Sequence, residues 1–418
     1  MKVGGALGPR PSSAYSEALA WLYGTQRFGI KLGLENVQRL LGELKVPGEE
    51  QRVIHVAGTN GKGSVCAMID SICRAQGYRT GLFSSPHLVT YRERIQVDGE
   101  RIAEEKVAAG LETIRQIIAS WEPHPTFFEI TTALALIHFK ESGCHVIVLE
   151  TGLGGRLDAT NAVRPVVCVI TPIGYDHQKW LGNTLEEIAG EKAGIIKARV
   201  PVVSSRQEPA AEKVLRARAT EFAAPIAFVD EPYAKSPVAL AGEHQNENAS
   251  LAIAALGAGG IAIEETAIVQ GLAKVRWPAR FQSWDERIIV DGAHNPAGAA
   301  VLAKTWREQF GNERATIVLA VLRDKDVAGI CHALAPIARR VILPEVRTER
   351  AVPPAEVAQI LSTITPALHY SISPSVMEAL AAARAGSERI LITGSLHFAG
   401  EALATLSGHP DALEDCAQ

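Results

Sequence analysis

The stretch HVAGTNGKGS (residues 55–64) combines small residues with a lysine and a final serine, as phosphate-binding loops do. The apolar run VIHVA leads into it, and a helical pattern begins at Lys62. Because small residues let backbone N–H groups approach phosphate oxygens at a positive helix end, this order predicts a nucleotide site. Lys62 would lie against the β- and γ-phosphates, and Ser64 would help to hold Mg²⁺. The alternative, a glycine-rich turn with an exposed lysine, does not require this complete strand-loop-helix order.

The loop departs from the common GxxxxGK[ST] form in two ways. Its first two glycines are closer together, and Gly63 separates the lysine from the serine. The residues expected around ATP phosphates are Gly58, Thr59, Asn60, Gly61, Lys62, Gly63 and Ser64.

A second polar cluster, ETGLGGRLDATN (150–161), follows the apolar run HVIVLE. Glu150 closes that run, and side chains at this end of parallel strands face the ligand crevice of open α/β sheets. A carboxylate there can bind the Mg²⁺ of ATP, because magnesium prefers oxygen ligands. Arg156 and Asp158 are expected to pair and brace the glycine-rich turn. A capped turn with a surface glutamate is the alternative.

A third cluster lies in YDHQKWLGNTLEEIAGEKAGIIK (175–197), directly after the run VVCVIT. Asp176 and His177 are expected at the same sheet edge, although histidine is an unusual ligand for magnesium. Lys192 on the following helix has two interpretations. It could pair with Glu187 or Glu191 on the surface, or it could be buried near the metal, where desolvation lowers the pKa of a lysine amine.

Further polar residues lie late in the chain. VDGAHNP (290–296) ends another apolar run with Asp291, then supplies His294 and Asn295 before a helix. Asn248 and Arg280 lie near the expected domain junction. Each of these could instead be a helix cap or a surface cation.

The elements that must position these side chains alternate between strand and helix, which predicts doubly wound parallel sheets. A chain of 418 residues is too long for one ordinary core. The strand-helix rhythm restarts after WPARFQ (277–282), so we expect an α/β fold with two domains. Residues 1–283 would form a P-loop-containing, ATPase-like domain, and residues 284–418 a smaller Rossmann-like domain. The apolar run at 249–263 is expected to be a buried helix capped by Asn246 or Asn248.

The composition excludes several classes of protein. A net charge of −4 with 21% charged residues argues against a nucleic-acid binder, which would be strongly basic. The longest apolar run is too short to span a membrane, and the first residues lack the apolar core of a signal peptide. Scattered cysteines without a CxxC pair are typical of reduced thiols. We therefore expect a cytoplasmic enzyme, monomeric, with small-molecule substrates and no membrane or nucleic-acid partner.

Taken in order, these motifs resemble the folylpolyglutamate synthase and dihydrofolate synthase family of the Mur ligase superfamily. The resemblance runs from about Phe28 to Glu401. The motifs that carry it are GTNGKGS, SSPH (84–87), FFE (127–129), ETGLGGRLDATN, DH…LG…EKAGI, HQ..NA, RFQ, DGAHNP and GSLHFAGE (394–401).

The resemblance implies roles for individual residues. Lys62, Lys192 and His294 would be catalytic; Lys192 would be carbamylated, and His294 would face the γ-phosphate. Asn248, Arg280 and Asp291 would complete the ATP site. The implied Mg²⁺ ligands are Ser64, Ser85, Glu150 and His177. The implied folate-binding residues are Ser84, Pro86, His87, Arg92 and Phe128.

The implied activity is an ATP- and Mg²⁺-dependent ligation in folate biosynthesis and one-carbon metabolism. ATP would convert a pteroate or folate carboxylate into an acyl phosphate, which the amine of L-glutamate attacks. Both dihydropteroate and tetrahydrofolate are expected as acceptors, because FSSPHLVTYRERI resembles the bifunctional bacterial enzymes. A monofunctional folylpolyglutamate synthase is the alternative.

Two other functions stay open from the sequence. Peptidoglycan-precursor ligases of the same superfamily more usually read GTxGKT[TS], so Gly63 argues against them. A nucleotide-binding regulator without ligase chemistry is a different class. A GTP-binding switch would carry an NKxD motif, which this sequence lacks.

Overall fold

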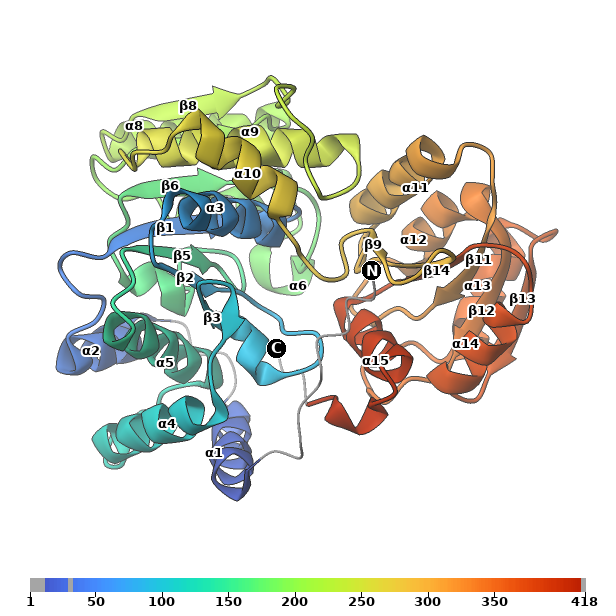
Figure 1. The fold of residues 1–418 in the computed structure, drawn as a ribbon, viewed down its shortest axis with the longest axis horizontal. Coiled ribbons are helices and arrows are strands. Elements are labelled where there is room, and N and C mark those ends of the chain that lie inside the picture. The colour runs from blue at the N-terminus through green and yellow to red at the C-terminus, as the bar shows by residue number, and fades with distance from the viewer. Residues whose placement is uncertain (1–11, 29–32, 415–418) are drawn as a thin grey trace.

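The computed structural model describes residues 12–28 and 33–414, which form two α/β lobes, each built on its own sheet (Figure 1). The first sheet has eight strands. In spatial order they are β4 (Glu100–Arg101), β3 (Ile95–Val97), β2 (Thr80–Phe83), β5 (Val146–Glu150), β1 (Arg52–Ala57), β6 (Val167–Ile170), β7 (Val202–Ser205) and β8 (Ile226–Val229). All pairings are parallel except those of β3 with β2 and β4.

Helices cover both faces of this sheet, which explains why its central strands are mostly apolar. On one face Ile147 and Leu149 pack with α1 (Ser13–Gly24), α2 (Glu35–Leu44), α4 (Glu104–Ile118) and α5 (Phe127–Glu141). On the other face Val146 and Val148 pack with α3 (Lys62–Gln76), α9 (Glu243–Ala258) and α10 (Glu265–Lys274). The helices α7 (Leu185–Ala193) and α8 (Pro209–Glu221) lie on the face opposite α9, where they pack on Cys168 and Ile170 of β6 and Val202 of β7.

The second sheet has six strands, and only its edge strand β9 is antiparallel. In spatial order they are β13 (His369–Ser373), β12 (Ala338–Pro344), β11 (Ala315–Leu319), β14 (Ile390–Thr393), β10 (Ile288–Val290) and β9 (Gln282–Ser283). One face carries α11 (Pro296–Phe310), α12 (Val327–Leu334) and α13 (Pro354–Ile364), and the other carries α14 (Val376–Arg384) and α15 (Leu396–Leu406).

The predicted α/β class with parallel sheets is therefore confirmed. The chain passes from one sheet to the other between Lys274 and Gln282. The expected division at 283/284 would leave β9 in the first lobe, although β9 pairs with β10; we propose a boundary within 275–281. In the described residues no helix is both long and apolar enough to cross a membrane.

One local prediction is wrong. Helix α9 is mostly buried, as expected, but it begins at Glu243 after Gly242. Asn246 and Asn248 therefore lie inside the helix and do not cap it. This change matters for the site, because Asn248 then faces the phosphate loop from a neighbouring helix.

Candidate active site

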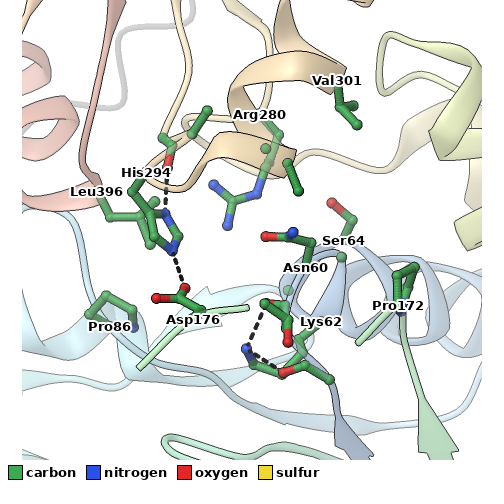
Figure 2. A pocket seen from close by; sticks show the side chains of 18 of the residues that line it. Asn60, Lys62, Ser64, Pro86, Pro172, Asp176, Arg280, His294, Val301 and Leu396 are labelled. Atoms are coloured by element: carbon green, nitrogen blue, oxygen red, sulfur yellow. Dashed lines mark hydrogen bonds and ion pairs between the residues drawn. The ribbon is translucent and has the colours of Figure 1, made fainter. Parts of the chain in front are cut away.

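A cavity of about 370 Å³ lies between the two lobes and receives side chains from both (Figure 2). The first lobe contributes the loop 58–64 and the residues that follow β5 and β6. The second lobe contributes Arg280, Asp291 and His294 with the start of α11. The clusters predicted at strand ends thus converge on one site, because parallel strands present their carboxyl ends at a common edge.

The phosphate loop has the geometry that its sequence predicts. Helix α3 begins at Lys62, and Gly61 before it adopts a φ of 89°, which favours glycine. The amides of Thr59 and Asn60 donate to Pro172 O, which ties the loop to the segment after β6. Lys62 Nζ lies 3.3 Å from Gly58 O and from Thr59 O. The backbone N–H groups at the start of α3 are thus directed toward the cavity end of the loop.

Two hydrogen-bonded side chains of α9 support this loop. Asn248 Nδ2 donates to Gln245 Oε1 at 3.0 Å, and Gln245 Nε2 donates to Ser64 Oγ at 3.4 Å. A Cβ on Gly61 would lie 2.8 Å from Asn248 Oδ1, so Asn248 packs directly on the loop. The cavity continues past these residues toward an apolar wall of Ala241, Val301 and Leu302.

Gly63, the residue that departs from the common loop pattern, lies against Trp277. A Cβ at position 63 would lie 2.6 Å from Trp277 Nε1 and 3.1 Å from its Cε2. Trp277 belongs to the segment that links the two lobes. Glycine is therefore required here because the linker indole occupies the space of a side chain.

Glu150 and Ser85 form the floor of the cavity beside this loop. Burial raises the pKa of Glu150, while the nearby Lys62 and Arg280 charges act in the opposite direction. The Ser85 amide lies 3.4 Å from Glu150 Oε2. Ser85 Oγ is shielded from solvent and has no hydrogen-bond partner among the described residues. A buried carboxylate and a buried hydroxyl without a partner fit a hard cation.

The protein does not supply a complete metal cage by itself. Within residues 12–28 and 33–414, no group of three or more His, Cys, Asp or Glu side chains is arranged to hold a metal ion. His177 lines the cavity, but the nearest charged group recorded for it is Asp176, 4.0 Å away. Burial lowers the pKa of His177 to about 4, so its imidazole is neutral and able to coordinate. Mg²⁺ commonly takes one or two carboxylates and completes its shell with water and substrate phosphates, which this arrangement permits.

Lys192 is buried, so its surface interpretation is wrong. Its Nζ donates to Gly58 O at 2.8 Å, directly behind the phosphate loop. Burial, together with the Lys62 charge, lowers the pKa of Lys192 to about 7. The neighbouring Glu191 is engaged elsewhere: it accepts from Arg156, with Nη2 to Oε1 at 2.8 Å.

The predicted Arg156–Asp158 pair is consequently wrong. Asp158 accepts from the amides of Gly152, Leu153 and Thr160 instead, and so shapes the turn from inside. An aspartate two residues after an arginine can satisfy a tight turn more directly than it can reach back to that arginine.

Asp176 is the main polar link between the lobes. Lys325 Nζ lies 2.6 Å from its Oδ1, Asn295 Nδ2 lies 3.2 Å from its Oδ2, and His294 Nε2 lies 3.4 Å from its Oδ2. Asn295 Nδ2 also donates to Asn60 Oδ1 of the phosphate loop. Burial opposes ionisation of Asp176, but the hydrogen bond from His294 and the positive charge of Lys325 outweigh it and hold its pKa well below the usual range. Figure 2 shows His294 pointing at this carboxylate.

The second lobe also presents Asp291 and Arg280 to the cavity. Asp291 accepts from the amides of Phe281 and Ala293 at 2.7 and 2.8 Å, and burial raises its pKa. Arg280 lies between two residues with positive φ, Ala279 at 54° and Phe281 at 43°. Backbone held in that region outside glycine is uncommon, and here it aims Arg280 into the cavity.

The residues expected to bind folate are divided. Pro86 lines the cavity, whereas four others lie outside its lining: Ser84, His87, Arg92 and Phe128. Ser84 and His87 are buried, and His87 Nδ1 accepts from Arg94 Nε at 2.9 Å. Arg92 donates to Ile102 O. Phe128 packs beneath the turn after β5, where its Cζ would lie 2.6 Å from a Cβ on Gly152. Phe128 thus supports a turn that lines the cavity, and contact of these four residues with a ligand stays a prediction.

Several cavity residues were not predicted from the sequence. Lys325 follows β11 in the run VLRDKD, and the polar-strand-end argument applied to Glu150 would have found it. Thr348, Arg350, Ser395 and His397 complete the second-lobe side of the cavity. Gln245 and Trp277 stand in quoted motifs, but no sequence signal connects them with the phosphate loop.

Comparison with known families agrees with this geometry. Residues 56–228 match the Mur ligase middle domain, and residues 279–396 match the Mur ligase glutamate ligase domain. A dihydrofolate synthase/folylpolyglutamate synthase from Bacillus subtilis is 37% identical over 423 residues, covering 92% of this chain and 97% of that protein.

Solved structures extend the likeness to the whole fold. Folylpolyglutamate synthase from Mycobacterium tuberculosis, complexed with ADP, aligns with a TM-score of 0.86 at 31% identity, covering 97% of this chain and 99% of that one. A bifunctional folylpolyglutamate synthase/dihydrofolate synthase from Yersinia pestis, complexed with AMPPNP and a manganese ion, aligns with a TM-score of 0.85 at 29% identity, covering 96% and 99%.

Proposed function

The chain belongs to the Mur ligase family, within its folylpolyglutamate and dihydrofolate synthases, and on that premise we propose that it joins L-glutamate to a pteroate or folate carboxylate with hydrolysis of ATP. One observation carries the proposal. The phosphate loop, the Glu150–Ser85 pair and the second-lobe residues Asp291 and His294 surround a single cavity between two lobes. A reaction of three substrates with a water-sensitive intermediate requires such an enclosed site.

The chemistry follows from the poor reactivity of a carboxylate. An acceptor carboxylate oxygen attacks the γ-phosphorus of ATP, and ADP leaves. The amine of glutamate then attacks the acyl carbon of the resulting acyl phosphate, loses a proton, and phosphate departs. Lys62 would neutralise charge on the transferred group in the first step. His294, held through Nδ1 by Gly292 O at 2.8 Å, would approach the γ-phosphate from the second lobe.

Mg²⁺ would be held by Glu150, Ser85, His177 and Ser64 together with phosphate oxygens. When bound, the ion supplies positive charge beside the transferred phosphoryl group. Glu150 would be its anionic ligand, and the nearby Lys62 charge favours the ionised carboxylate that this role needs. Asn248, Arg280 and Asp291 would contact the nucleotide, with its base against Ala241, Val301 and Leu302.

Lys192 would act as a carbamate. A buried amine with a pKa of about 7 is substantially neutral near physiological pH, and only the neutral amine adds to CO₂. The product carries a carboxylate-like end behind the phosphate loop, where it would offset the Lys62 charge and orient the metal site.

The acceptor range is proposed to include both dihydropteroate and tetrahydrofolates. We further propose that the protein is a monomer and that it is cytoplasmic. The location is supported by free, buried thiols at Cys66, Cys73, Cys144, Cys168 and Cys331, as expected in a reducing compartment.

The direct test is a phosphate-release assay. Purified protein with ATP, Mg²⁺ and L-glutamate should release phosphate only when dihydropteroate or a reduced folate is added, and the product should contain one more glutamate by mass spectrometry. Equal phosphate release without a folate, or release that depends on a muramyl peptide, would reject the proposal. Activity with tetrahydrofolate but not dihydropteroate would identify a monofunctional enzyme.

A further inference from the structure

The loop Ser84–Tyr91 belongs to both lobes at once. Its first part is in the active site, because Ser85 and Pro86 line the cavity. Its second part is in the core of the other lobe, where Leu88 and Val89 are buried among α14 and α15 residues. The position of Ser85 therefore depends on how the second lobe holds the loop.

Helix α15 contacts this loop at close range. A Cβ on Gly400 would collide with the backbone of Leu88, so the helix can approach only where a glycine stands. The N-terminal end of the same helix reaches the cavity through Ser395 and Leu396. Helix α15 thus connects the cavity with the far end of the loop.

The chain then returns to the loop after α15. The 3₁₀ turn η5 (Pro410–Ala412) leads to Glu414, whose amide donates to Val89 O at 2.9 Å. The Glu414 carboxylate accepts from the Tyr91 amide at 2.6 Å and from Thr90 Oγ1 at 3.2 Å. It also accepts from the hydroxyl of Tyr15, on α1, at 3.1 Å.

These contacts complete the hydrogen bonding of four consecutive loop amides. Glu93 within the first lobe accepts from the amides of Leu88, Val89 and Thr90. Only the fourth amide, that of Tyr91, is bound by a carboxylate from the end of the chain. An acceptor that is ionised and partly buried makes such bonds stronger than neutral ones.

We propose that Glu414 is a positioning residue, and that the segment Ser407–Glu414 clasps the loop so that Ser85 and Pro86 keep their places in the cavity. The inference rests on the proposed function for its substrates. Removal of the clasp would loosen the floor that receives the acceptor and the metal. The ATP phosphates would be little affected, because their loop is bound by Pro172, Asn248 and Trp277 instead.

The test compares Glu414→Ala and Glu414→Gln with a matched control, Asp411→Ala. Asp411 lies on the same segment, but its side chain is fully exposed. For Glu414→Ala we expect KM for the folate acceptor to rise about tenfold, with a smaller rise in KM for ATP, since loss of a charge-assisted hydrogen bond costs about that factor. Glu414→Gln keeps one acceptor oxygen and should recover part of the loss. Asp411→Ala should match the wild type.

Hydrogen exchange provides a second measurement that needs no substrate. In Glu414→Ala the amides of Ser85 and of residues 87–91 should exchange faster, while those of α3 should keep their protection. If loop exchange and acceptor KM both match the wild type, the clasp is refuted. Equal rises in the KM of acceptor and of ATP would also refute it, because a general loss of structure moves both. Failure of the wild-type enzyme to use any folate would reject the proposed function, whereas the exchange result would still decide the clasp.

Discussion

Lys325 Nζ lies 2.6 Å from Asp176 Oδ1, and both side chains are buried between the lobes. The pair joins the segment after β6 to the segment after β11, the two strand ends that face each other across the cavity. Because its members come from different lobes, this ion pair can form fully only when the lobes are closed together. The Lys325–Asp176 pair is therefore a marker of the closed arrangement of the lobes, in which water is excluded from the cavity.

Replacing Lys325 should disturb catalysis more than folding. In Lys325→Gln the Asp176 carboxylate keeps Asn295 and His294 as partners but loses its closest cation. We expect kcat/KM to fall at least about tenfold, because a buried charge without its partner is costly. Steady-state phosphate release measures this. Lys304→Gln is the control. Lys304 also pairs with carboxylates from both lobes, those of Glu308 and of Glu243 on α9, but it is exposed, so the substitution should leave kcat/KM unchanged. Wild-type kinetics in Lys325→Gln would contradict a role for closure.

The contact between Gly63 and Trp277 predicts a coupled pair of substitutions. Gly63→Ala places a methyl group 2.6 Å from Trp277 Nε1, so the loop or the linker must move. We expect KM for ATP to rise about tenfold, a typical effect of overpacking by 1–3 kcal/mol. Trp277→Leu in the same chain should restore part of the affinity, since it removes the opposing ring.

A double-mutant cycle on Gly63 and Trp277 separates this contact from general damage. Gly257→Ala serves as the control, because nothing lies within 4 Å of a Cβ there. It should be neutral or stabilising, as alanine is favoured over glycine in a helix. Purely additive effects of the two substitutions would show that the linker does not shape the loop.

Lys62→Ala should abolish turnover and leave the fold intact. The half-buried ammonium donates to two carbonyls of its own loop, so we expect its removal to leave the core packing intact. Its role is to meet charge that develops on the phosphoryl group, and loss of such a group typically costs about 10²–10³ in kcat. Phosphate release and thermal unfolding are measured together. Lys179→Ala, an exposed lysine of α6 (Gln178–Leu181), should retain activity. Activity retained in Lys62→Ala would overturn our interpretation of the loop.

Lys192 makes stability depend on pH in a defined direction. Its folded pKa is about 7, whereas its ordinary value is 10.5, so the unfolded chain binds more protons between those values. Stability should therefore rise as pH increases from about 7 toward 10. In CO₂-free buffer, the free energy of unfolding of Lys192→Met should lack this rise with pH. The variant should therefore exceed the wild type in stability by the largest margin near pH 7.

Carbamylation of Lys192 can be detected directly. Protein equilibrated with ¹³C-bicarbonate near pH 8 should show a carbamate carbon resonance that is absent in Lys192→Met. Added bicarbonate should raise the activity of enzyme stripped of CO₂. A wild-type spectrum without that resonance, combined with full activity, would mean that the neutral amine itself serves in the site.

The sequence by itself determined the elements of the site that are local. A strand, a glycine-rich loop and a helix in immediate succession define the phosphate loop. Glu150 and His177 could be assigned to one edge because Glu150 ends one apolar strand and His177 lies in the segment that follows another, and parallel strands end on the same side of a sheet. Such inferences succeed because the backbone geometry relates neighbouring residues in a fixed way.

Tertiary structure alone decided the contacts between distant segments. The sequence shows that Gly63 is unusual, but only the fold shows the Trp277 ring that requires it. Lys192 could be surface or buried until the loop carbonyl of Gly58 was found beside it. The predicted Arg156–Asp158 pair does not form because the fold brings Glu191, which is distant in sequence, next to the Arg156 guanidinium. In each case the outcome depends on which surfaces pack together, since burial and the nearest charge are properties of the assembled core and not of the local chain.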